Sequence, residues 1–415
     1  MATEVLARGE TFAVLVGLMT FDQDENTLEE LEFLAQTAGV QVAEKVVQKR
    51  QTVDVAFYIG KGKAYEIADI AKAHQANAVI FDDELSPVQI RNLENVIGAQ
   101  IIDRTTLILD IFAQRAMSQE GQIQVELAQL KYMLPRLTGK GIELSREGGG
   151  IGTRGPGETK LETDRRHIRR RIGRLKTELE KVRKNRKVLR ESREFPVVSL
   201  VGYTNAGKST LMNALTDAKV SNYNRLFDTL DTTVRGMVLP DERTILLSDT
   251  VGFIRKLPHD IIEAFKATLE EVTESDLIIH VADASSPNLD IEISTVKSVL
   301  KQIGAENKPT ILAVNKIDKI PQGELLFRGP DVVPISAQYG INLASLVSKI
   351  SEMLPSNRVG VSLLIPYEMS HLIDLIYETS LVEKSEFKPE GIQIEGMIDN
   401  ITLEKIRKDV QIYPI

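Results

Sequence analysis

The sequence contains no cysteine and no long hydrophobic run, and both absences narrow what the chain can be. Without cysteine there are no disulfides, no thiolate nucleophile and no zinc site of the cysteine type. The longest early apolar run, Phe12–Met19, is far shorter than the roughly 20 residues of a membrane helix, and it lacks the charged leader of a signal peptide. We therefore expect a buried strand there, no membrane insertion and a cytoplasmic location.

Charge is unevenly distributed along the 415 residues. The formal net charge is −8, which taken alone argues against a nucleic-acid partner. Between Asp164 and Arg193, however, fourteen Lys and Arg stand against four Asp and Glu, so this stretch carries +10 and the remainder −18. Such asymmetry predicts one dedicated basic surface.

The first part of the chain alternates strand-like and helix-like segments. We expect strands at Thr11–Met19, Ala78–Phe81 and Gln100–Ile102, and helices at Thr27–Ala38, Lys63–Ala73 and Pro87–Ile97. Thr27 with Glu30, and Ser86 with Gln89, have the spacing of capping boxes at the start of two of these helices. Gly39 and Gly98 are placed where the same two helices end. The alternation predicts a small α/β domain with a mainly parallel sheet.

Two helices with an unusual connection follow. One is expected at Ile123–Leu134, and the second carries a heptad stripe of apolar residues: Leu161, Ile168, Ile172, Leu175, Leu179, Val182 and Leu189. An antiparallel hairpin accounts for both. The connecting loop, Gly139–Gly157, has too much glycine to contribute to a core, so it is expected to be flexible or to let the backbone approach a partner closely.

A nucleotide-binding signature follows the apolar strand Val197–Val201. The segment Gly202, Tyr203, Thr204, Asn205, Ala206, Gly207, Lys208, Ser209 has Walker A spacing and runs into an apolar helix that begins with Thr210. The glycines allow backbone N–H groups to surround the phosphates, Lys208 bridges β- and γ-oxygens, and Ser209 offers its hydroxyl to Mg²⁺. These residues predict phosphate and magnesium binding.

Three later segments predict that the base is guanine and that the γ-phosphate is sensed. Asp249, Thr250, Val251 and Gly252 follow a strand and supply a carboxylate for water-mediated contact with Mg²⁺ and a glycine N–H toward the γ-phosphate. A second strand is followed by Asn315, Lys316, Ile317 and Asp318. A buried Asp318 carboxylate would accept hydrogen bonds from guanine N1–H and the 2-amino group, and would reject adenine by about 10⁴-fold or more. Ser336 and Ala337 fit the loop whose backbone reads guanine O6. Together these segments predict a GTP hydrolase.

The hydrolytic machinery departs from the common pattern in two places. Phe253 stands where many GTPases have a water-orienting Gln, so intrinsic hydrolysis is expected to be slow, with the missing group supplied by a partner, a cation or a rearranged loop. Asn205 is the residue that potassium-activated GTPases show, so K⁺ is a second candidate cofactor besides Mg²⁺; Asn205 could equally serve loop hydrogen bonding. The loop Asn222–Arg235 is expected to be the first switch, in which Thr229, Thr232 and Thr233 are candidates to complete the Mg²⁺ shell.

The chain resembles the HflX family of GTPases over essentially its whole length up to about residue 355. The resemblance rests on four segments: the loop from Gly148 to Glu162 running into Asp164–Arg166, the helix Ile123–Leu137, the stretch Phe81–Ser86, and the switch segment Phe227, Asp228, Thr229, Leu230 and Asp231 with Leu226 before it. It implies that Thr229 is the magnesium-binding switch threonine and that residues 227–231 contact GTP. It also implies GTP-dependent binding to ribosomes, chiefly the large subunit, with separation of stalled or idle ribosomes.

The basic surface is consistent with the RNA contact that the resemblance implies. The candidate RNA-binding residues are those of the loop and the start of the second helix: Arg146, Arg154, Lys160, Arg165, Arg166, Arg169 and Arg170. The alternative is a regulatory GTPase that acts on a protein partner through its coiled coil without RNA. A GTPase associated with RNA modification is a third option, although nothing outside the GTPase motifs resembles a modification centre.

The expected fold class is therefore multi-domain α/β. We divide the chain into an amino-terminal α/β domain (1–117), a helical hairpin with its glycine-rich loop (118–194), a P-loop GTPase domain (195–355) and a small carboxy-terminal α/β domain (356–415). In the last we expect strands at Val361–Ile365 and Ile392–Ile394 and a helix at Glu368–Tyr377. We expect a monomer whose ligands are GTP and GDP.

Overall fold

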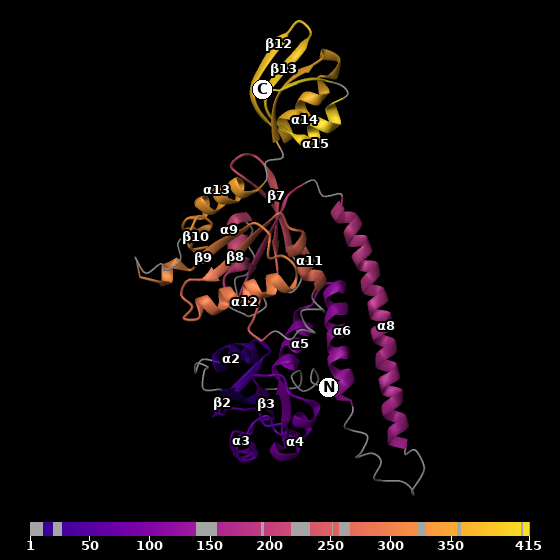
Figure 1. The fold of residues 1–415 in the computed structure, drawn as a ribbon, viewed down its shortest axis with the longest axis vertical. Coiled ribbons are helices and arrows are strands. Elements are labelled where there is room, and N and C mark those ends of the chain that lie inside the picture. The colour runs from indigo at the N-terminus through magenta and orange to yellow at the C-terminus, as the bar shows by residue number, and fades with distance from the viewer. Residues whose placement is uncertain are drawn as a thin grey trace.

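A computed structural model describes residues 11–19, 27–137, 156–191, 195–216, 233–250, 252–256, 266–321, 329–354, 358–407 and 410–414. Three sheets form in these residues, each with its own helices, and they follow one another along the long axis of the molecule (Figure 1). The middle sheet lies between an amino-terminal and a carboxy-terminal unit. Two long helices run beside the first two units. The mixed α/β architecture predicted from the sequence is confirmed.

The amino-terminal sheet is entirely parallel, with the order β2-β1-β3-β4. Its strands are β1 (Thr11–Met19), β2 (Val40–Lys49), β3 (Ala78–Phe81) and β4 (Gln100–Asp103). Its helices are α2 (Thr27–Thr37), α3 (Lys61–Ala73), α4 (Pro87–Ile97) and α5 (Arg104–Arg115). The sequence did not predict β2 or α5. Helix α4 begins with the expected capping box of Ser86 and Gln89 and ends at Gly98, which has φ 72°.

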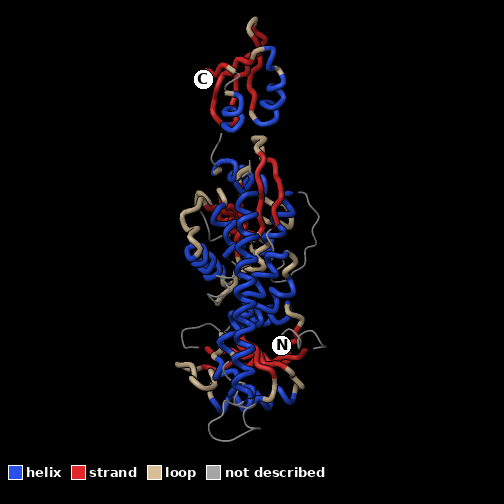
Figure 2. The backbone as a smooth tube through the Cα atoms, turned by 90° about the vertical axis from the view of Figure 1, so that its right-hand side faces the viewer, coloured by secondary structure: helices blue, strands red, loops and turns tan. Residues whose placement is uncertain are grey.

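The two long helices pack against each other as a hairpin. Helix α6 (Gln119–Arg136) and helix α8 (Pro156–Glu191) share a small core in which Leu175 and Leu179 of the predicted heptad stripe meet Ile123 and Leu127. The second helix starts at Pro156, whereas the sequence placed its glycine loop as far as Gly157. Proline suits a first helical turn, because the N–H it lacks has no partner there in any case. Seen from the side, α8 passes along both the first and the middle unit (Figure 2).

The middle sheet has the order β10-β9-β8-β5-β7-β6, parallel except for β6. Its strands are β5 (Val197–Gly202), β6 (Thr233–Val238), β7 (Thr244–Asp249), β8 (Leu277–Asp283), β9 (Thr310–Asn315) and β10 (Val332–Pro334). The helices are α9 (Lys208–Thr216), α11 (Lys266–Glu274), α12 (Leu289–Gln302) and α13 (Leu343–Met353). Both faces of the sheet are covered by helices, which gives two apolar clusters.

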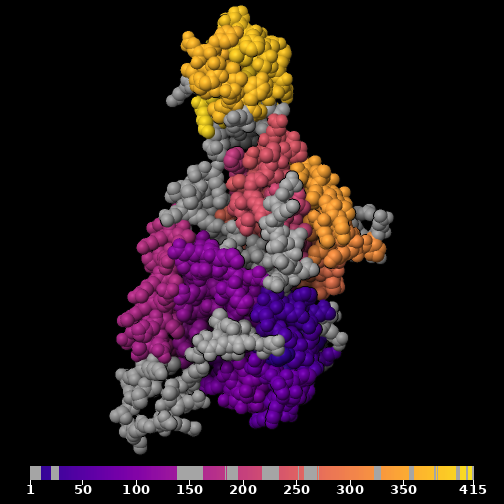
Figure 3. All heavy atoms as spheres, turned by 180° about the vertical axis from the view of Figure 1, so that it is seen from behind, coloured from indigo at the N-terminus to yellow at the C-terminus, as the bar shows by residue number. Residues whose placement is uncertain are grey.

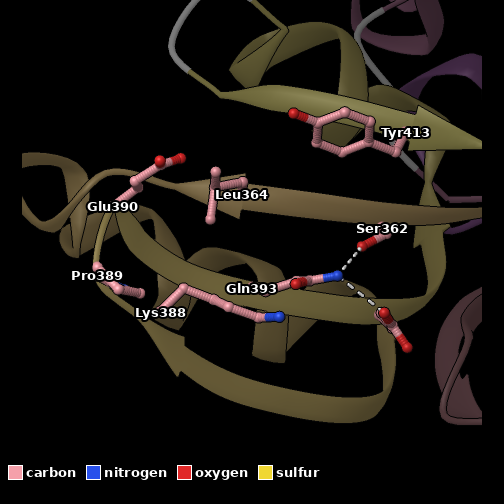
Figure 4. Close-up of a pocket in the computed structure, with 8 residues that line it drawn as sticks. Ser362, Leu364, Lys388, Pro389, Glu390, Gln393 and Tyr413 are labelled. Carbon is pink, nitrogen blue, oxygen red and sulfur yellow. Dashed lines mark hydrogen bonds between the residues drawn. The ribbon is translucent and has the colours of Figure 1, made fainter.

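The carboxy-terminal unit is an antiparallel sheet of order β12-β13-β11-β14 with two helices on one face. It comprises β11 (Arg358–Ile365), α14 (His371–Thr379), β12 (Leu381–Lys388), β13 (Gly391–Asp399), α15 (Asn400–Ile406) and β14 (Gln411–Pro414). This is the split βαβ arrangement. The open face carries a pocket lined by Ser362, Gln393 and Tyr413 (Figure 4), in which Gln393 Nε2 donates to Ser362 Oγ at 2.8 Å. Strands β12 and β14 and helix α15 were not predicted.

No helix in the described ranges has both the length and the apolar character that crossing a membrane requires.

Candidate nucleotide site

The predicted phosphate loop lies where the strand order of the middle sheet reverses. Strand β5 is flanked by β8 on one side and β7 on the other, and the loop from Gly202 to Lys208 leaves its carboxyl end. Open parallel sheets bind ligands in the crevice at such a switch point, because neighbouring loops diverge there. The first turn of α9 follows directly, so its N–H groups point toward the same crevice.

Two glycines of this loop are required by close backbone packing. A Cβ on Gly202 would lie 2.2 Å from the carbonyl oxygen of Val281, and one on Gly207 would lie 2.3 Å from Asn315 Nδ2. Gly207 also has φ +96°, a region that side chains disfavour. Asn205 has φ 62°, which asparagine tolerates better than most residues, and its side chain is exposed.

Lys208 is the cation at the bottom of the loop. Its Nζ donates to the carbonyl oxygens of Gly202 at 3.1 Å and Tyr203 at 3.0 Å, and the residue is 7% exposed. Burial lowers the pKa of Lys208 to about 8, while the Asp249 carboxylate opposes that shift. The charged form is therefore costly in this position, and phosphate oxygens would offset that cost.

The predicted magnesium-side residues converge beside the loop. Ser209 Oγ donates to Asp249 Oδ2 at 2.8 Å, and the buried Thr250 hydroxyl donates to the carbonyl oxygen of Leu200 at 2.7 Å. Thr250 thus holds the end of β7 against β5, which places the Asp249 carboxylate at the start of α9. In the part of the chain that the structure describes, no three His, Asp or Glu side chains gather as a metal site. A hydroxyl and one carboxylate are the oxygen donors that Mg²⁺ takes when phosphates supply the rest.

The segments predicted to read the base are joined to the predicted phosphate loop by hydrogen bonds. Asn315 Nδ2 donates to the carbonyl oxygen of Ala206 at 2.9 Å, and its Oδ1 accepts from the Ala337 N–H at 2.9 Å. Lys316 Nζ donates to the Asn205 carbonyl oxygen at 2.7 Å and pairs with Asp283. Asn315 therefore joins three loops that are separate in the sequence. The pairing with Asp283 was not predicted from sequence, since nothing local marks it.

Asp318 differs from the expectation in its exposure. Its Oδ1 accepts from Ser336 Oγ at 2.5 Å, which brings the two predicted base-reading loops together, but the residue is exposed rather than buried. It lies in a short 3-10 turn, Ile317–Lys319, that projects past the end of β9. The predicted rejection of adenine by about 10⁴-fold stays a prediction, because it depends on how far a bound base covers this carboxylate.

Phe253, which replaces the water-orienting Gln, points away from the phosphate loop. Its ring is 3% exposed and packs with Val201, Leu269 and Val272. Its backbone pairs with the loop instead: the Phe253 N–H donates to the Gly202 carbonyl oxygen and the Phe253 carbonyl oxygen accepts from the Thr204 N–H. The residue thus anchors the segment after Gly252 and offers no group to water.

Several predicted residues lie outside the described ranges. These are Arg146, Arg154, Val251, Thr232 and the switch segment Phe227, Asp228, Thr229, Leu230 and Asp231. Lys160, Arg165, Arg166, Arg169 and Arg170 all belong to α8, where Arg166, Arg169 and Arg170 are exposed and Arg165 is half-buried.

Glu30 has a position that sequence reasoning did not foresee. The sequence predicts it as part of a capping box on α2, and in the structure its Oε1 accepts from the hydroxyl of Tyr203, in the phosphate loop, at 2.7 Å. The amino-terminal unit therefore touches the edge of the middle sheet that carries the predicted site, and the space-filling view shows the two units in direct contact (Figure 3).

Comparison with known proteins gives matches over most of the chain. Residues 25–113 match the family described as GTP-binding GTPase N-terminal, residues 115–193 the GTP-binding GTPase Middle Region, and residues 197–316 the 50S ribosome-binding GTPase family. Together they span the amino-terminal unit, the hairpin and the phosphate loop.

Relatives named GTPase HflX match over nearly their full length. The one from Caldanaerobacter subterraneus subsp. tengcongensis is 49% identical over 97% of this chain and 95% of its own. The one from Escherichia coli K12 is 44% identical, with 91% of each chain covered. Among solved structures, a GTP-binding protein from Sulfolobus solfataricus in complex with GDP is 30% identical, covers 83% of this chain and 98% of its own, and gives a TM-score of 0.45.

Proposed function

Because the chain belongs to the HflX family of GTPases, we propose that it binds the large ribosomal subunit in a GTP-dependent way and separates stalled or idle ribosomes. That it hydrolyses GTP to GDP and phosphate follows from the family and from the GTPase domain. The ribosomal partner is the part of the proposal that goes beyond the family assignment. The family matched by residues 197–316 is described as 50S ribosome-binding, which supports a ribosomal partner for this chain.

The observation that carries the ribosomal proposal is the exposed basic face of α8. Arg166, Arg169, Arg170 and Arg174 are exposed along this helix, whereas its apolar side packs on α6. Arg171 is paired with Glu126 of α6 and so helps to hold the hairpin together. A row of exposed guanidinium groups suits phosphate oxygens of an RNA backbone, which neutralise each charge without requiring a base sequence.

Roles within the nucleotide site are proposed from the same geometry. Lys208 contacts the β- and γ-phosphates, Gly252 donates its N–H to the γ-phosphate, and Asp318 accepts from guanine, with the backbone of Ser336 and Ala337 beside O6. We extend the GTP contacts to the rest of the phosphate loop up to Thr210 and to residues 227–231. These assignments place catalysis on Lys208, Asp249, Gly252, Thr229 and Asn205.

Mg²⁺ is the cofactor that the donor set fits. Ser209 Oγ, the first proposed protein ligand, donates to the Asp249 carboxylate, which is proposed to reach the ion through water. Thr229 of the switch is the second proposed protein ligand. When bound, the ion neutralises phosphate charge. The residues of this chain orient it: Ser209 from the first turn of α9, and Asp249 from the end of β7.

Since Phe253 is buried, the group that completes hydrolysis comes from outside the described site. The ribosome is one proposed source and K⁺ another, because Asn205 is exposed on the phosphate loop. Comparing GTP hydrolysis in KCl and in NaCl tests the second: a faster rate in KCl that Asn205→Ala abolishes supports K⁺ activation, and equal rates exclude it.

We propose that the four segments 1–117, 118–194, 195–355 and 356–415 act as amino-terminal domain, hairpin, GTPase domain and carboxy-terminal domain of a cytoplasmic monomer. In this division the hairpin approaches RNA and the GTPase domain controls when it does so. Size-exclusion chromatography with light scattering tests the monomer directly.

Sedimentation with isolated large subunits, in GDP and in a non-hydrolysable GTP analogue, tests the function. Contact with RNA phosphates is supported if pelleting depends on the analogue and if the double variant Arg166→Ala with Arg170→Ala weakens it. In that variant the slope of log affinity against log salt concentration should also fall in magnitude by about two. The matched control is Lys297→Ala with Lys301→Ala, which removes two exposed charges at the same spacing from α12. No pelleting in either nucleotide would contradict the proposal and favour a protein partner for the coiled coil.

A further inference from the structure

Lys316 is held between the phosphate loop and the end of β8. Its Nζ donates to the carbonyl oxygen of Asn205 at 2.7 Å and lies 2.6 Å from Asp283 Oδ2. The backbone of Lys316 has φ 63° and ψ 32°, a left-handed conformation that costs free energy in a residue other than glycine. The structure therefore holds this ammonium group in one place with two acceptors, one of which belongs to the phosphate loop.

Asp283 has a fixed position of its own. It is the last residue of β8 and pairs in register with Asn315, the last residue of β9. Its Oδ1 accepts from the backbone N–H of Ser285 at 2.9 Å and from the Ser285 hydroxyl at 2.7 Å, so Oδ2 is the oxygen that faces Lys316. Only 17% of the Asp283 side chain and 18% of the Lys316 side chain are exposed. Water therefore screens this ion pair less than it screens a pair on the open surface.

The contact from Lys316 fixes one peptide plane of the phosphate loop. In a trans peptide the carbonyl group and the N–H that follows it point in opposite directions. Because the Asn205 carbonyl oxygen is directed at Lys316, the Ala206 N–H points back across the loop, where it donates to the Tyr203 carbonyl oxygen at 3.2 Å. That oxygen also accepts from Lys208 Nζ at 3.0 Å. A continuous series of contacts thus leads from Asp283 to the lysine at the bottom of the phosphate loop.

The charge of Asp283 and its contact with Lys316 have opposite effects on a bound phosphate. A carboxylate near the site repels phosphate oxygens, so its charge alone opposes nucleotide binding. The contact favours binding, because it keeps Lys316 on the Asn205 carbonyl oxygen and the loop in one conformation. Removal of the carboxylate therefore raises nucleotide affinity if charge dominates, and lowers it if the contact dominates.

We propose that Asp283 is a positioning residue of the nucleotide site, which holds Lys316 against the phosphate loop and so keeps the peptide between Asn205 and Ala206 in the conformation that binds phosphate. The inference rests on the proposed phosphate contacts of the loop and of Lys208, and it does not depend on ribosome binding. Asp283 touches neither phosphate nor base in this account, since it acts through Lys316.

Asp283→Asn tests this, because it removes the charge at nearly constant size. GDP affinity is measured on the full chain by equilibrium titration, with thermal unfolding recorded for each variant. The matched control is Glu292→Gln, which removes a carboxylate from the same neighbourhood. Burial raises the pKa of Glu292, the Asp283 carboxylate adds to that shift and Lys316 opposes it, but the hydrogen bond of Glu292 is to the Ser286 hydroxyl, at 2.6 Å. Lys316→Met, alone and combined with Asp283→Asn, completes a double-mutant cycle.

Asp283→Asn is expected to lower GDP affinity about 5-fold or more, and Glu292→Gln to change it by less than about 2-fold. In the Lys316→Met background Asp283→Asn should have no further effect, since both act through one contact. Affinity for inosine diphosphate, whose base lacks the 2-amino group of guanine, should fall by the same factor as affinity for GDP, because the contact lies on the phosphate side.

An unchanged or raised GDP affinity in Asp283→Asn overturns the inference, and so does a loss that persists in the Lys316→Met background. A loss for GDP without a loss for inosine diphosphate overturns it too, because the effect would then lie at the base. Lys208→Ala reports on the phosphate loop separately. If Lys208→Ala abolishes GDP binding while Asp283→Asn does nothing, the role of the loop stands and the positioning role fails. If neither variant acts, both fail.

Discussion

The amino-terminal sheet is parallel and the middle sheet is parallel except for β6, and both carry helices on their faces, yet the carboxyl ends of their strands have opposite character. In the GTPase domain that edge carries the glycines of the phosphate loop and Lys208. In the amino-terminal domain, β3 is followed by Asp82 and Asp83, and β4 ends at Asp103. The first edge suits a bound anion. The second suits cations, and it holds Arg104 and Lys256.

One architecture therefore serves two purposes according to the charge at the strand ends. Parallel α/β sheets place loops at a common edge whatever their sequence. Glycines and a lysine suit that edge to a nucleotide, whereas buried carboxylates suit it to the cations of a neighbouring segment. Changes at the first edge are expected to alter nucleotide binding, and changes at the second to alter stability.

Asp318→Asn is expected to have the largest effect. Two hydrogen bonds from guanine to a charged acceptor contribute about 1.5–3 kcal/mol each, so GDP affinity should fall on the order of 10³-fold. Affinity for a xanthosine nucleotide should rise, because its carbonyl can accept from the new amide. Competition titration with both nucleotides measures this. Unchanged guanine preference would mean that another group reads the base.

Gly207→Ala is expected to weaken nucleotide binding about 100-fold. The added methyl would lie 2.3 Å from Asn315 Nδ2 in a backbone with φ +96°, and such strain costs about 1–3 kcal/mol before the displaced Asn315 is counted. Gly304→Ala is the control, since it has φ +80° and nothing within 4 Å of the new Cβ. It should lower stability without changing GDP affinity. Equal loss of binding in both variants would contradict the proposed geometry.

Asp103→Asn should destabilise the amino-terminal domain by about 2–4 kcal/mol. Its carboxylate accepts from the backbone N–H of Thr106 at 3.0 Å and of Leu85 at 3.2 Å, and from the hydroxyl of Tyr132. The NH₂ group of an Asn side chain would face these N–H and O–H donors and could not accept hydrogen bonds from them. Chemical denaturation measures the loss, and GDP affinity should stay within about 2-fold. A loss of GDP affinity without a loss of stability would contradict this account, because it would mean that the nucleotide binds at the carboxyl edge of the amino-terminal sheet.

Proton uptake at Lys208 is the smallest effect. With a pKa of about 8 in the free protein, the lysine is charged at pH 7 and half charged at pH 8. Phosphate contact favours the charged form, so binding should take up almost no proton at pH 7 and about half a proton at pH 8. Above pH 8, affinity should fall as pH rises. Calorimetry in buffers of different ionisation enthalpy measures the uptake, and its absence at pH 8 would contradict the pKa shift at Lys208.

Much of this site could be predicted from sequence because its residues are neighbours along the chain. The phosphate loop and the segments at Asp249, Asn315 and Ser336 each follow an apolar strand, and β-strand order brings them together. The network around Arg104 could not be predicted from sequence. Its members are distant from one another along the chain and have no characteristic spacing: Glu30, Asp82, Tyr203 and Arg255. The exposure of Asp318 was also missed, because a motif does not reveal how far its turn projects.

The fold was predictable from sequence where a strand is a continuous apolar run or a helix has clear caps. Strands β1 and β3 are continuous apolar runs, and α4 has clear caps. Strand β2 was missed because it lies at the sheet edge and alternates little: Val40 and Val46 are buried between polar residues. Helix α5 was missed because it is buried on several sides, which removes the helical period that sequence reasoning depends on.

Single-turnover GTP hydrolysis, measured with and without isolated large ribosomal subunits, tests the central claim most directly. Phe253 is buried and offers nothing to water, so the free chain should hydrolyse GTP slowly and added subunits should accelerate it about 10-fold or more. An identical rate in the two conditions, with the protein shown to bind GTP, would contradict the claim that the ribosome completes this site.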